Sequence, residues 1–139
     1  MSRTFVMCKP DAVKRGLVGE IIARVERKGL RLAAVELRHV DTALAEEHYA
    51  EHADKPFFGK LVSFLTRSPV VAMAVDGPGD DTWLIARLLI GATKVQDAQP
   101  GTIRGDFATT TNENLVHGSD SDESARRELG LWFPGLPAS

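Results

Sequence analysis

The chain has 139 residues, of which 43% are hydrophobic and 26% are charged, and its formal net charge is −2 at pH 7. This apolar content excludes an intrinsically disordered protein, and the length predicts one domain, residues 1–139, with its own core. The near-zero charge argues against a protein whose main task is to coat nucleic acid, although it does not exclude a local basic cluster.

The single cysteine, Cys8, has no second cysteine in the chain with which to form a disulfide, which favours a reducing compartment. The apolar run at 5–8 is too short for the core of a signal peptide. No window approaches the ~18 apolar residues that a membrane-spanning helix needs. We therefore expect a cytoplasmic protein with no membrane partner.

The first half of the chain predicts two strands and three helices. A short apolar strand at 3–9 is stopped by Pro10, which lacks the backbone donor that a continuing strand needs. Apolar residues at helical spacing predict a helix at 18–28, which Gly29 ends. The other expected elements are a strand at 31–38, a helix capped by Asp41 or Thr42 and running to about 50, and a helix at 57–66.

The second half begins with VVAMAV at 70–75, which predicts a strand buried on both faces, followed by a turn at 76–79. From 91 to 113 the apolar periodicity disappears, which predicts a long and therefore functional loop. The other expected elements are a helix capped by Asp80 or Asp81 and running to Ile90, a strand at 114–117, and a helix capped by Ser119 or Asp120 and running to about 132.

Strands that alternate with helices in this way predict an α/β (α+β) arrangement, with helices covering one sheet. Four short strands joined by split crossovers favour the ferredoxin-like fold, a four-stranded antiparallel sheet covered by helices.

HYAEH at 48–52 matches the H-x-x-E-H pattern of inverted zinc peptidases. On one helix the two histidines would share a face at i and i+4, as two zinc ligands require. A zinc hydrolase also needs a third ligand and a cleft wide enough for a peptide, which require much more chain than is present. We therefore interpret the motif chiefly as a solvated helix face.

Glycine-rich phosphate loops are absent from the sequence, so a nucleotide site must use side chains. His117 follows an apolar pair and precedes the small Gly118, which leaves its ring accessible, and a neutral imidazole is a competent nucleophile near pH 7. Glu128 on the following helix lies within reach of the second ring nitrogen. Taken alone, the pattern is more typical of a surface-loop histidine beside a helix cap.

Four segments add context to His117. They are VMCKPDAVKRGLVGEII at 6–22, HYAEHADKPFF at 48–58, GTIRGDF at 101–107 and NLVHGSDSDESARREL at 114–129. Together they resemble the nucleoside diphosphate kinase family over residues 3 to about 133, and N-x-x-H-G-S-D at 114–120 matches the family's nucleophile signature. The short ending WFPGLPAS is similar to that of the bacterial members.

The resemblance implies transfer of a γ-phosphoryl group from a nucleoside triphosphate to a nucleoside diphosphate. The implied mechanism is ping-pong, through a phosphohistidine at His117, with Glu128 accepting a hydrogen bond from its second ring nitrogen. Tyr49 matches the aromatic hydroxyl beside the histidine, with a half-buried helix tyrosine as the alternative. Ser119 is expected to cap the next helix and to have a minor catalytic role.

The resemblance also implies a set of nucleotide contacts. Cationic phosphate contacts suit a reaction that consists mainly of positioning and charge stabilisation. A base held only by stacking implies broad base specificity, because every base has a π-face. The matching residues are Lys9, Arg87 and Arg104 for phosphate, Thr93 as a hydroxyl donor, Lys9 and Asn114 for the ribose 3′-hydroxyl, and Phe57 for the base, with a core position as the alternative for Phe57.

Mg²⁺ is expected on the nucleotide phosphates, without a set of protein ligands. The expected partners are nucleoside triphosphates and diphosphates and further copies of the chain, with a hexamer favoured over a tetramer or dimer and no specific nucleic acid. The alternative function is a nucleotide- or nucleic-acid-binding regulator on the same fold with little turnover. The intact pair of His117 and Glu128 favours the enzyme, because a binding protein needs no nucleophile.

Three positions depart from the family pattern. Lys94-Val95 stands where the family usually has Asn or Asp followed by Pro, and Thr111 stands where an aliphatic residue often faces the base. Arg67-Ser68 replaces the common Ser-Gly. The first departure is expected to affect assembly or stability more than chemistry, and the second to weaken nucleotide packing slightly.

Overall fold

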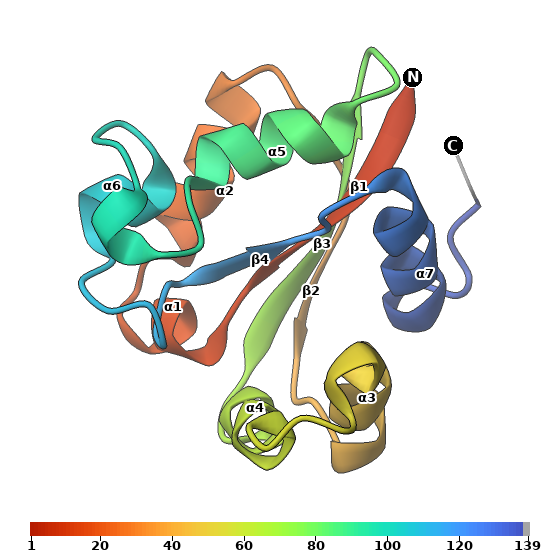
Figure 1. The fold of residues 1–139 in the computed structure, drawn as a ribbon. Helices are drawn as coiled ribbons and strands as arrows, with labels where there is room; N and C mark the ends of the chain where they lie inside the picture. Colours follow the sequence, from red (N-terminus) through yellow and green to blue (C-terminus); the bar gives the residue numbers. More distant parts are fainter. Residues whose placement is uncertain (138–139) are drawn as a thin grey trace.

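The structure is a computed structural model that describes residues 1–137. Its centre is one sheet with the strand order β2-β3-β1-β4, in which all neighbouring strands are antiparallel. The ferredoxin-like α/β fold expected from the element order is confirmed (Figure 1). The strands are β1 (Ser2–Cys8), β2 (Arg31–Arg38), β3 (Val70–Gly77) and β4 (Val116–Gly118).

Helices cover both faces of the sheet (Figure 1). On one face lie α1 (Pro10–Lys14), α2 (Val18–Arg27), α5 (Thr82–Ile90) and α6 (Ile103–Phe107). On the other face lie α3 (Thr42–His48), α4 (Phe58–Thr66) and α7 (Asp122–Trp132). Two short 3₁₀ turns, η1 (Ala50–His52) and η2 (Val95–Asp97), belong to the connections.

The central strands send alternate side chains into two cores, as the period of a strand requires. In β1, Val6 and Cys8 enter the core under α2 and α5, whereas Phe5 and Met7 enter the core under α3, α4 and α7. All eight residues of β3 are buried, so the prediction of a strand buried on both faces is confirmed.

Two short helices lie where the sequence predicts none, so that part of the prediction is wrong. Pro10 stops β1, but its fixed φ also suits the first position of a helix, and α1 begins there. Within the expected 91–113 loop, Thr102 starts α6 by accepting a hydrogen bond from the Gly105 N–H at 2.9 Å. Both helices have five residues, too few for an apolar period to appear.

The predicted cap of α3 is confirmed, since the Asp41 side chain accepts a hydrogen bond from the Leu44 N–H at 2.8 Å. Asp81 occupies the N-cap position of α5, as predicted, but its side chain makes no cap bond, and the Thr82 N–H donates to Ser2 Oγ at 3.2 Å. Strand β1 therefore provides part of the cap that the local sequence was expected to provide.

The turn predicted at 76–79 is wrong in its first half, because Asp76 and Gly77 still belong to β3 and pair with β1. The cap predicted for the last helix is also displaced. Ser121 caps α7, accepting a hydrogen bond from the Ser124 N–H at 3.0 Å, and Ser119 and Asp120 precede the cap.

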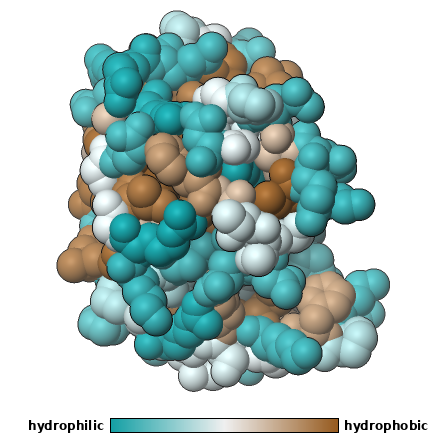
Figure 2. All heavy atoms as spheres, turned by 90° about the vertical axis from the view of Figure 1, so that its left-hand side faces the viewer, coloured by the Kyte–Doolittle hydropathy of each residue, from teal (hydrophilic) through white to brown (hydrophobic). Residues whose placement is uncertain are grey.

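Strand β2 forms an open edge of the sheet, with β3 on its only paired side. It exposes Val35 and Leu37, the latter 67% exposed. By contrast, the face around α6 is mostly hydrophilic with separate hydrophobic patches (Figure 2). Within residues 1–137, no helix combines the length and the apolar character needed to cross a membrane.

Candidate active site

His117 lies in β4, next to β1, and Glu128 projects toward it from α7. Glu128 Oε1 lies 2.9 Å from His117 Nε2 and accepts a second hydrogen bond from Ser119 Oγ at 2.7 Å. Burial acts to raise the pKa of Glu128, but the hydrogen bonds that it accepts from His117 and Ser119 bring it below its usual value. An ionised Glu128 only accepts, so His117 Nε2 carries the proton and Nδ1 keeps its lone pair.

Ser119 is 1% exposed and does not cap α7, so the predicted capping role is wrong. Its hydroxyl also lies 3.4 Å from the carbonyl oxygen of Phe5. Ser119, the residue after β4, thus connects the end of that strand with the carboxylate that orients His117.

A cavity of about 320 Å³ opens beside His117. The predicted site residues on its wall are Tyr49, Arg87, Thr93, His117 and Glu128. Burial raises the pKa of Tyr49 to about 12, which keeps its hydroxyl protonated and able to donate. Five residues from two helices, two connections and one strand therefore converge on a single polar cavity.

Arg87 reaches the site from α5, where its Nη1 donates to the carbonyl oxygen of Gly118 at 3.1 Å. Helix α5 can approach β4 closely because residue 118 is glycine: a Cβ there would meet Ile90 Cδ1 at 2.8 Å. The glycine after His117 thus has a packing reason as well as the steric one inferred from the sequence.

Lys9 and Asn114 form a second group of predicted site residues. Lys9 Nζ donates to Asn114 Oδ1 at 2.6 Å, and Asn114 Nδ2 donates to the carbonyl oxygen of Thr93 at 3.1 Å. Because Thr93 also lines the cavity, it connects this group with the surroundings of His117. Burial lowers the pKa of Lys9 to about 8, so the ammonium stays largely charged at neutral pH.

Arg104 is 4% exposed, and most of its guanidinium is occupied by backbone. It donates to the carbonyl oxygens of Asn114 at 3.2 Å, Gly91 at 3.1 Å and Val116 at 2.5 Å. Burial and the charge of Arg87 lower the pKa of Arg104 to about 10, so it remains a cation at pH 7. The structure therefore places this predicted phosphate contact as a support of the segment that carries His117.

Phe57 lies outside both groups, immediately before α4. It is 43% exposed, so the alternative of a core position is wrong. Its ring centroid is 5.5 Å from that of His52, which lines the cavity. An exposed aromatic ring near the cavity is suited to stacking on a base.

The HYAEH segment does not form the expected helix face. Helix α3 ends at His48, whereas His52 belongs to η1, so the two histidines do not stand at i and i+4 of one helix. His48 is 3% exposed, which contradicts the solvated face as well. Its ring stands edge-on to His117 with centroids 4.7 Å apart, and Trp132 Nε1–H donates to its Nδ1 at 3.1 Å.

His48, His117 and Glu128 each place one candidate metal-ligand atom within 4.8 Å of the others. The tautomer of His48 argues against a transition metal at this cluster. An indole nitrogen only donates, so Nδ1 of His48 must accept from Trp132 and Nε2 must carry the proton. A neutral imidazole held in this tautomer offers no lone pair to a metal.

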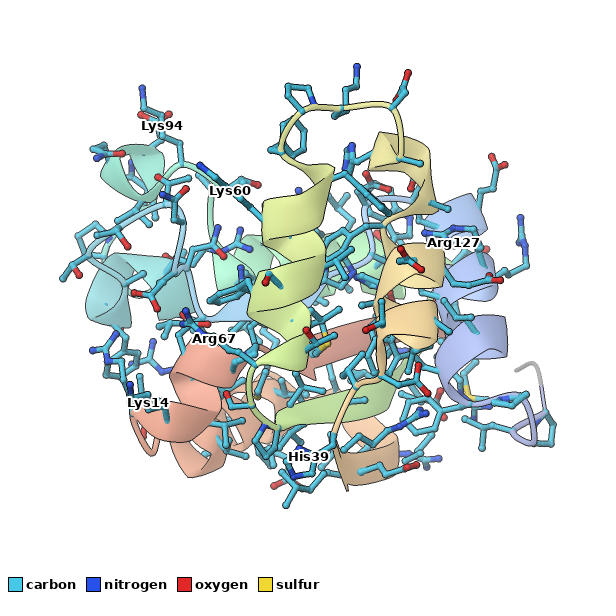
Figure 3. The ribbon with its side chains drawn as sticks, turned by 90° about the horizontal axis from the view of Figure 1, so that it is seen from below. Lys14, His39, Lys60, Arg67, Lys94 and Arg127 are labelled. Atoms are coloured by element: carbon cyan, nitrogen blue, oxygen red, sulfur yellow. The ribbon has the colours of Figure 1, made fainter. Side chains whose placement is uncertain are left out.

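His48, Trp132 and Arg127 were not predicted as site residues. Arg127 on α7 donates to the carbonyl oxygens of Glu47 at 3.1 Å and His48 at 3.0 Å, which links α7 to the end of α3 (Figure 3). His48 and Trp132 are 84 positions apart, and no local pattern connects them. The H-x-x-E-H motif drew attention to His48 only as a candidate zinc ligand.

The structure explains two of the departures from the family pattern together. The Val95 N–H donates to Thr111 Oγ1 at 3.1 Å. A proline at 95 could not donate this bond, and an aliphatic residue at 111 could not accept it. The two unusual residues therefore hold the loop after α5 against the segment before Asn114.

His48 predicts a pH dependence of stability. Burial, followed by the charge of His117, lowers the pKa of His48 to about 3, far below the ordinary value of about 6.5 for an unfolded chain. As the pH falls through 6.5, the unfolded chain binds a proton that the folded chain excludes. The free energy of unfolding should therefore decrease by about 2 kcal/mol between pH 7 and pH 5 from this residue alone.

Urea unfolding at pH 5, 6 and 7 measures this effect. A His48→Gln variant keeps an acceptor for Trp132 but cannot titrate, so its unfolding free energy should depend less on pH than that of the parent chain. His39→Gln, at an exposed position between β2 and α3, is the matched control and should retain the parental slope. Equal slopes for the parent chain and the His48 variant would contradict the assignment.

Comparison with known proteins agrees with this geometry. The family model described as nucleoside diphosphate kinase matches residues 2–137. A nucleoside diphosphate kinase of Exiguobacterium sibiricum is 60% identical over 137 residues, covering 99% of this chain and 98% of that protein. One of Thermus thermophilus is 59% identical over 135 residues, covering 96% of each chain.

Solved structures give the same result. A nucleoside diphosphate kinase family protein of Babesia bovis has a TM-score of 0.92 and 47% identity, covering 96% of this chain and 88% of its own. A halophilic nucleoside diphosphate kinase of Halobacterium salinarum in complex with CDP has a TM-score of 0.89 and 52% identity, covering 94% of this chain and 86% of its own. Sequence, fold and the arrangement around His117 therefore agree that the chain belongs to the nucleoside diphosphate kinase family.

Proposed function

We propose that Nδ1 of His117 carries the phosphoryl group in the transfer of γ-phosphate between nucleotides, which is the activity of the family. The observation that supports this most is the hydrogen bond between His117 Nε2 and Glu128 Oε1, which is itself held by Ser119. It leaves Nδ1 unprotonated and orients the ring, as a histidine nucleophile requires.

In the first half-reaction, the Nδ1 lone pair forms a bond to the γ-phosphorus, and the bond to the β–γ bridging oxygen breaks. The nucleoside diphosphate leaves with that electron pair, and the proton on Nε2 stays in its hydrogen bond to Glu128. In the second half-reaction a terminal β-phosphate oxygen of another diphosphate attacks the phosphorus. The bond between Nδ1 and phosphorus breaks, and its electron pair returns to Nδ1. The ping-pong order follows because both nucleotides use the same atom.

The other residues would act by position and charge. Arg87 and Arg104 would stabilise the phosphates, as would Lys9, which with Asn114 would also hold the ribose 3′-hydroxyl. The Tyr49 and Thr93 hydroxyls would donate to phosphate oxygens. Phe57 would stack on the base, which implies broad base specificity and suits a family whose Halobacterium member is solved with CDP.

Mg²⁺ is the cation that we propose for the bound nucleotide. It binds oxygen, favours substrate phosphates and water, and neutralises charge on the transferring group. The cavity wall fits such an ion, because it offers the carboxylates of Glu51 and Asp120 rather than a free imidazole at His48. The nucleotide phosphates and water would hold the ion, as expected from the sequence, and these two carboxylates would contact it only through that water.

Incubation with γ-labelled ATP and no acceptor tests the function. We expect an acid-labile and alkali-stable label on the protein that moves to added GDP. A regulatory protein that merely binds nucleotide would retain ATP without becoming labelled, and that outcome would contradict the proposal. Loss of activity with a zinc-selective chelator, with Mg²⁺ still present, would instead indicate a zinc enzyme.

We also propose that the chain acts in the cytoplasm as one domain and assembles with copies of itself, with a hexamer as the expected form. The open edge of β2, with exposed Val35 and Leu37, supports self-association, because proteins rarely leave such an edge uncovered. Light scattering should give about six times the chain mass of 15.1 kDa, and a monomer would contradict assembly.

A further inference from the structure

Asp11 is a buried acid next to the site for which the proposed reaction has no role. It lies in the first turn of α1 and is 4% exposed. Its Oδ2 accepts a hydrogen bond from the Leu115 N–H at 2.9 Å, and its Oδ1 has no hydrogen-bond partner among the described residues. A buried oxygen without a partner is costly, so a compensating interaction is expected.

The partner of Asp11 has an unusual backbone. Leu115 has a φ of +75°, the only positive φ of a non-glycine residue within 1–137. The Val116 N–H donates to the Asn114 carbonyl oxygen at 2.9 Å, so Leu115 is the central residue of a γ-turn of the positive-φ type, which is rare and strained. Both backbone polar groups of Leu115 are held by the connection between β1 and α1. Its N–H donates to Asp11, and its carbonyl oxygen accepts from the Lys9 N–H at 2.8 Å.

This backbone conformation determines where the site residues point. Asn114, immediately before Leu115, holds Lys9 Nζ, and His117 follows two residues later. A strained conformation that surrounding contacts impose is typical of functional sites. Asp11 therefore connects the corner between β1 and α1 with the segment that presents both Asn114 and the nucleophile.

Asp11 also has an electrostatic connection with the buried cations. Burial lowers the pKa of Lys9, and the groups facing it act in both directions: Asp11 and Glu113 raise it, and Arg104 lowers it. Asp11 acts in the same direction on Arg104, against burial and Arg87. Glu113 is half-exposed and paired with Arg67 at 2.6 Å, so Asp11 is the buried anion of this group.

We propose that Asp11 is a positioning residue for phosphoryl transfer: its buried carboxylate holds Leu115 in its positive-φ turn and is the internal counter-ion that keeps Lys9 charged. This rests on the proposed role of Lys9 and Asn114 in nucleotide binding. A purely structural alternative exists, because a carboxylate in the first turn also favours a helix. The two interpretations differ in the effect of removing the charge alone.

Asp11→Asn separates charge from hydrogen bonding, because the amide oxygen can still accept from the Leu115 N–H. With the anion removed, Lys9 should lose its proton at lower pH, by about one pH unit. The ratio of parental to variant kcat/KM should therefore grow about tenfold between pH 6 and pH 9. Asp11→Glu retains the charge, so the alkaline limb of its pH profile of kcat/KM should coincide with that of the parent chain, while kcat falls.

Two other variants and one direct measurement keep the test decisive. NMR titration of ¹³C-labelled Lys9, assigned by loss of its signal in Lys9→Arg, should show the lower titration point in Asp11→Asn without any turnover. Glu113→Gln, which removes a half-exposed anion, should shift it less. If Asp11→Asn does not fold, a parental alkaline limb in Asp11→Glu still supports the proposal, and a displaced one contradicts it.

An Asp11→Asn variant with the parental Lys9 titration would overturn the counter-ion role and leave a structural one. Failure of the proposed function would look different. In that case the parent chain would carry no phosphoryl label, while the effect of Asp11 on the Lys9 titration would still be measurable.

Discussion

Replacement of His117 by Asn is expected to abolish the covalent label and to lower kcat/KM by at least ~10⁴-fold, as removal of a covalent nucleophile does. The reason is local. Nδ1 of His117 is the ring nitrogen left free by the bond to Glu128 Oε1, and an asparagine amide nitrogen has no basic lone pair to replace it. The substitution shortens the side chain at a partly exposed position, so the fold should remain.

The measurements are γ-phosphate labelling, steady-state kinetics and binding of ADP. Labelling and turnover should fail together, while ADP still binds, because the phosphate and ribose contacts come from other residues. His39→Asn is the control, since it changes the same residue type at an exposed site and should label as the parent chain does. A persistent acid-labile label on the His117 variant would place the phosphoryl group on another residue.

Much of the fold follows from patterns that the sequence displays directly. The bounds of β2 were predicted to the residue, and β3 was predicted as buried on both faces, because continuous β-branched and apolar runs suit a central strand. The end of α2 before Gly29 was also predicted, and this glycine has a φ of +96° that other residues rarely adopt.

Other elements depend on contacts that no local window contains. Helix α6 has only two large apolar residues, Ile103 and Phe107, and its buried Arg104 is satisfied by carbonyl groups 10 to 13 positions away. The start of α5 likewise depends on Ser2, which lies 80 positions away. Hydrophobic periodicity cannot show such polar tertiary contacts.

The candidate site, like the fold, could be predicted only in part from the sequence. The 114–120 motif indicated the nucleophile proposed here, His117, and the resemblance added the residues that surround it. Neither the motif nor the resemblance could show that Trp132 determines the tautomer of His48. They also could not show that Ser119 binds Glu128 instead of capping α7, or that Asp11 holds a strained Leu115. Each of these depends on the direction of a donor in three dimensions, which residue spacing does not specify.

Arg104→Leu is expected to lower the free energy of unfolding by about 3–5 kcal/mol, because each buried carbonyl oxygen left without a donor costs about 1–3 kcal/mol. The guanidinium satisfies the carbonyl oxygens of Gly91, Asn114 and Val116 in a buried setting. Leucine would remove this donor from all three, and among the described residues only the Asn114 carbonyl would keep another, the Val116 N–H at 2.9 Å. Two of these carbonyls lie on the segment that carries His117, so phosphoenzyme formation should also slow.

Arg87→Leu is the matched control. It removes the same charge from the same site, but Arg87 is half-buried and donates to one carbonyl oxygen, that of Gly118. Its cost in unfolding free energy should therefore stay near 1.5–3 kcal/mol, while its effect on phosphoryl transfer should remain large. Arg104→Lys should recover only part of the stability, because one ammonium cannot match the planar fork that spans three acceptors.

Urea unfolding of the three variants, followed by labelling with γ-labelled ATP, separates support of the backbone from contact with phosphate. Equal losses of stability for Arg104→Leu and Arg87→Leu would mean that the carbonyl contacts of Arg104 contribute little. Full recovery by Arg104→Lys would mean that charge, not geometry, holds β4. The expected order of stability, with the Arg87 variant above Arg104→Lys and Arg104→Leu lowest, follows only if the buried guanidinium itself bridges the three carbonyl groups.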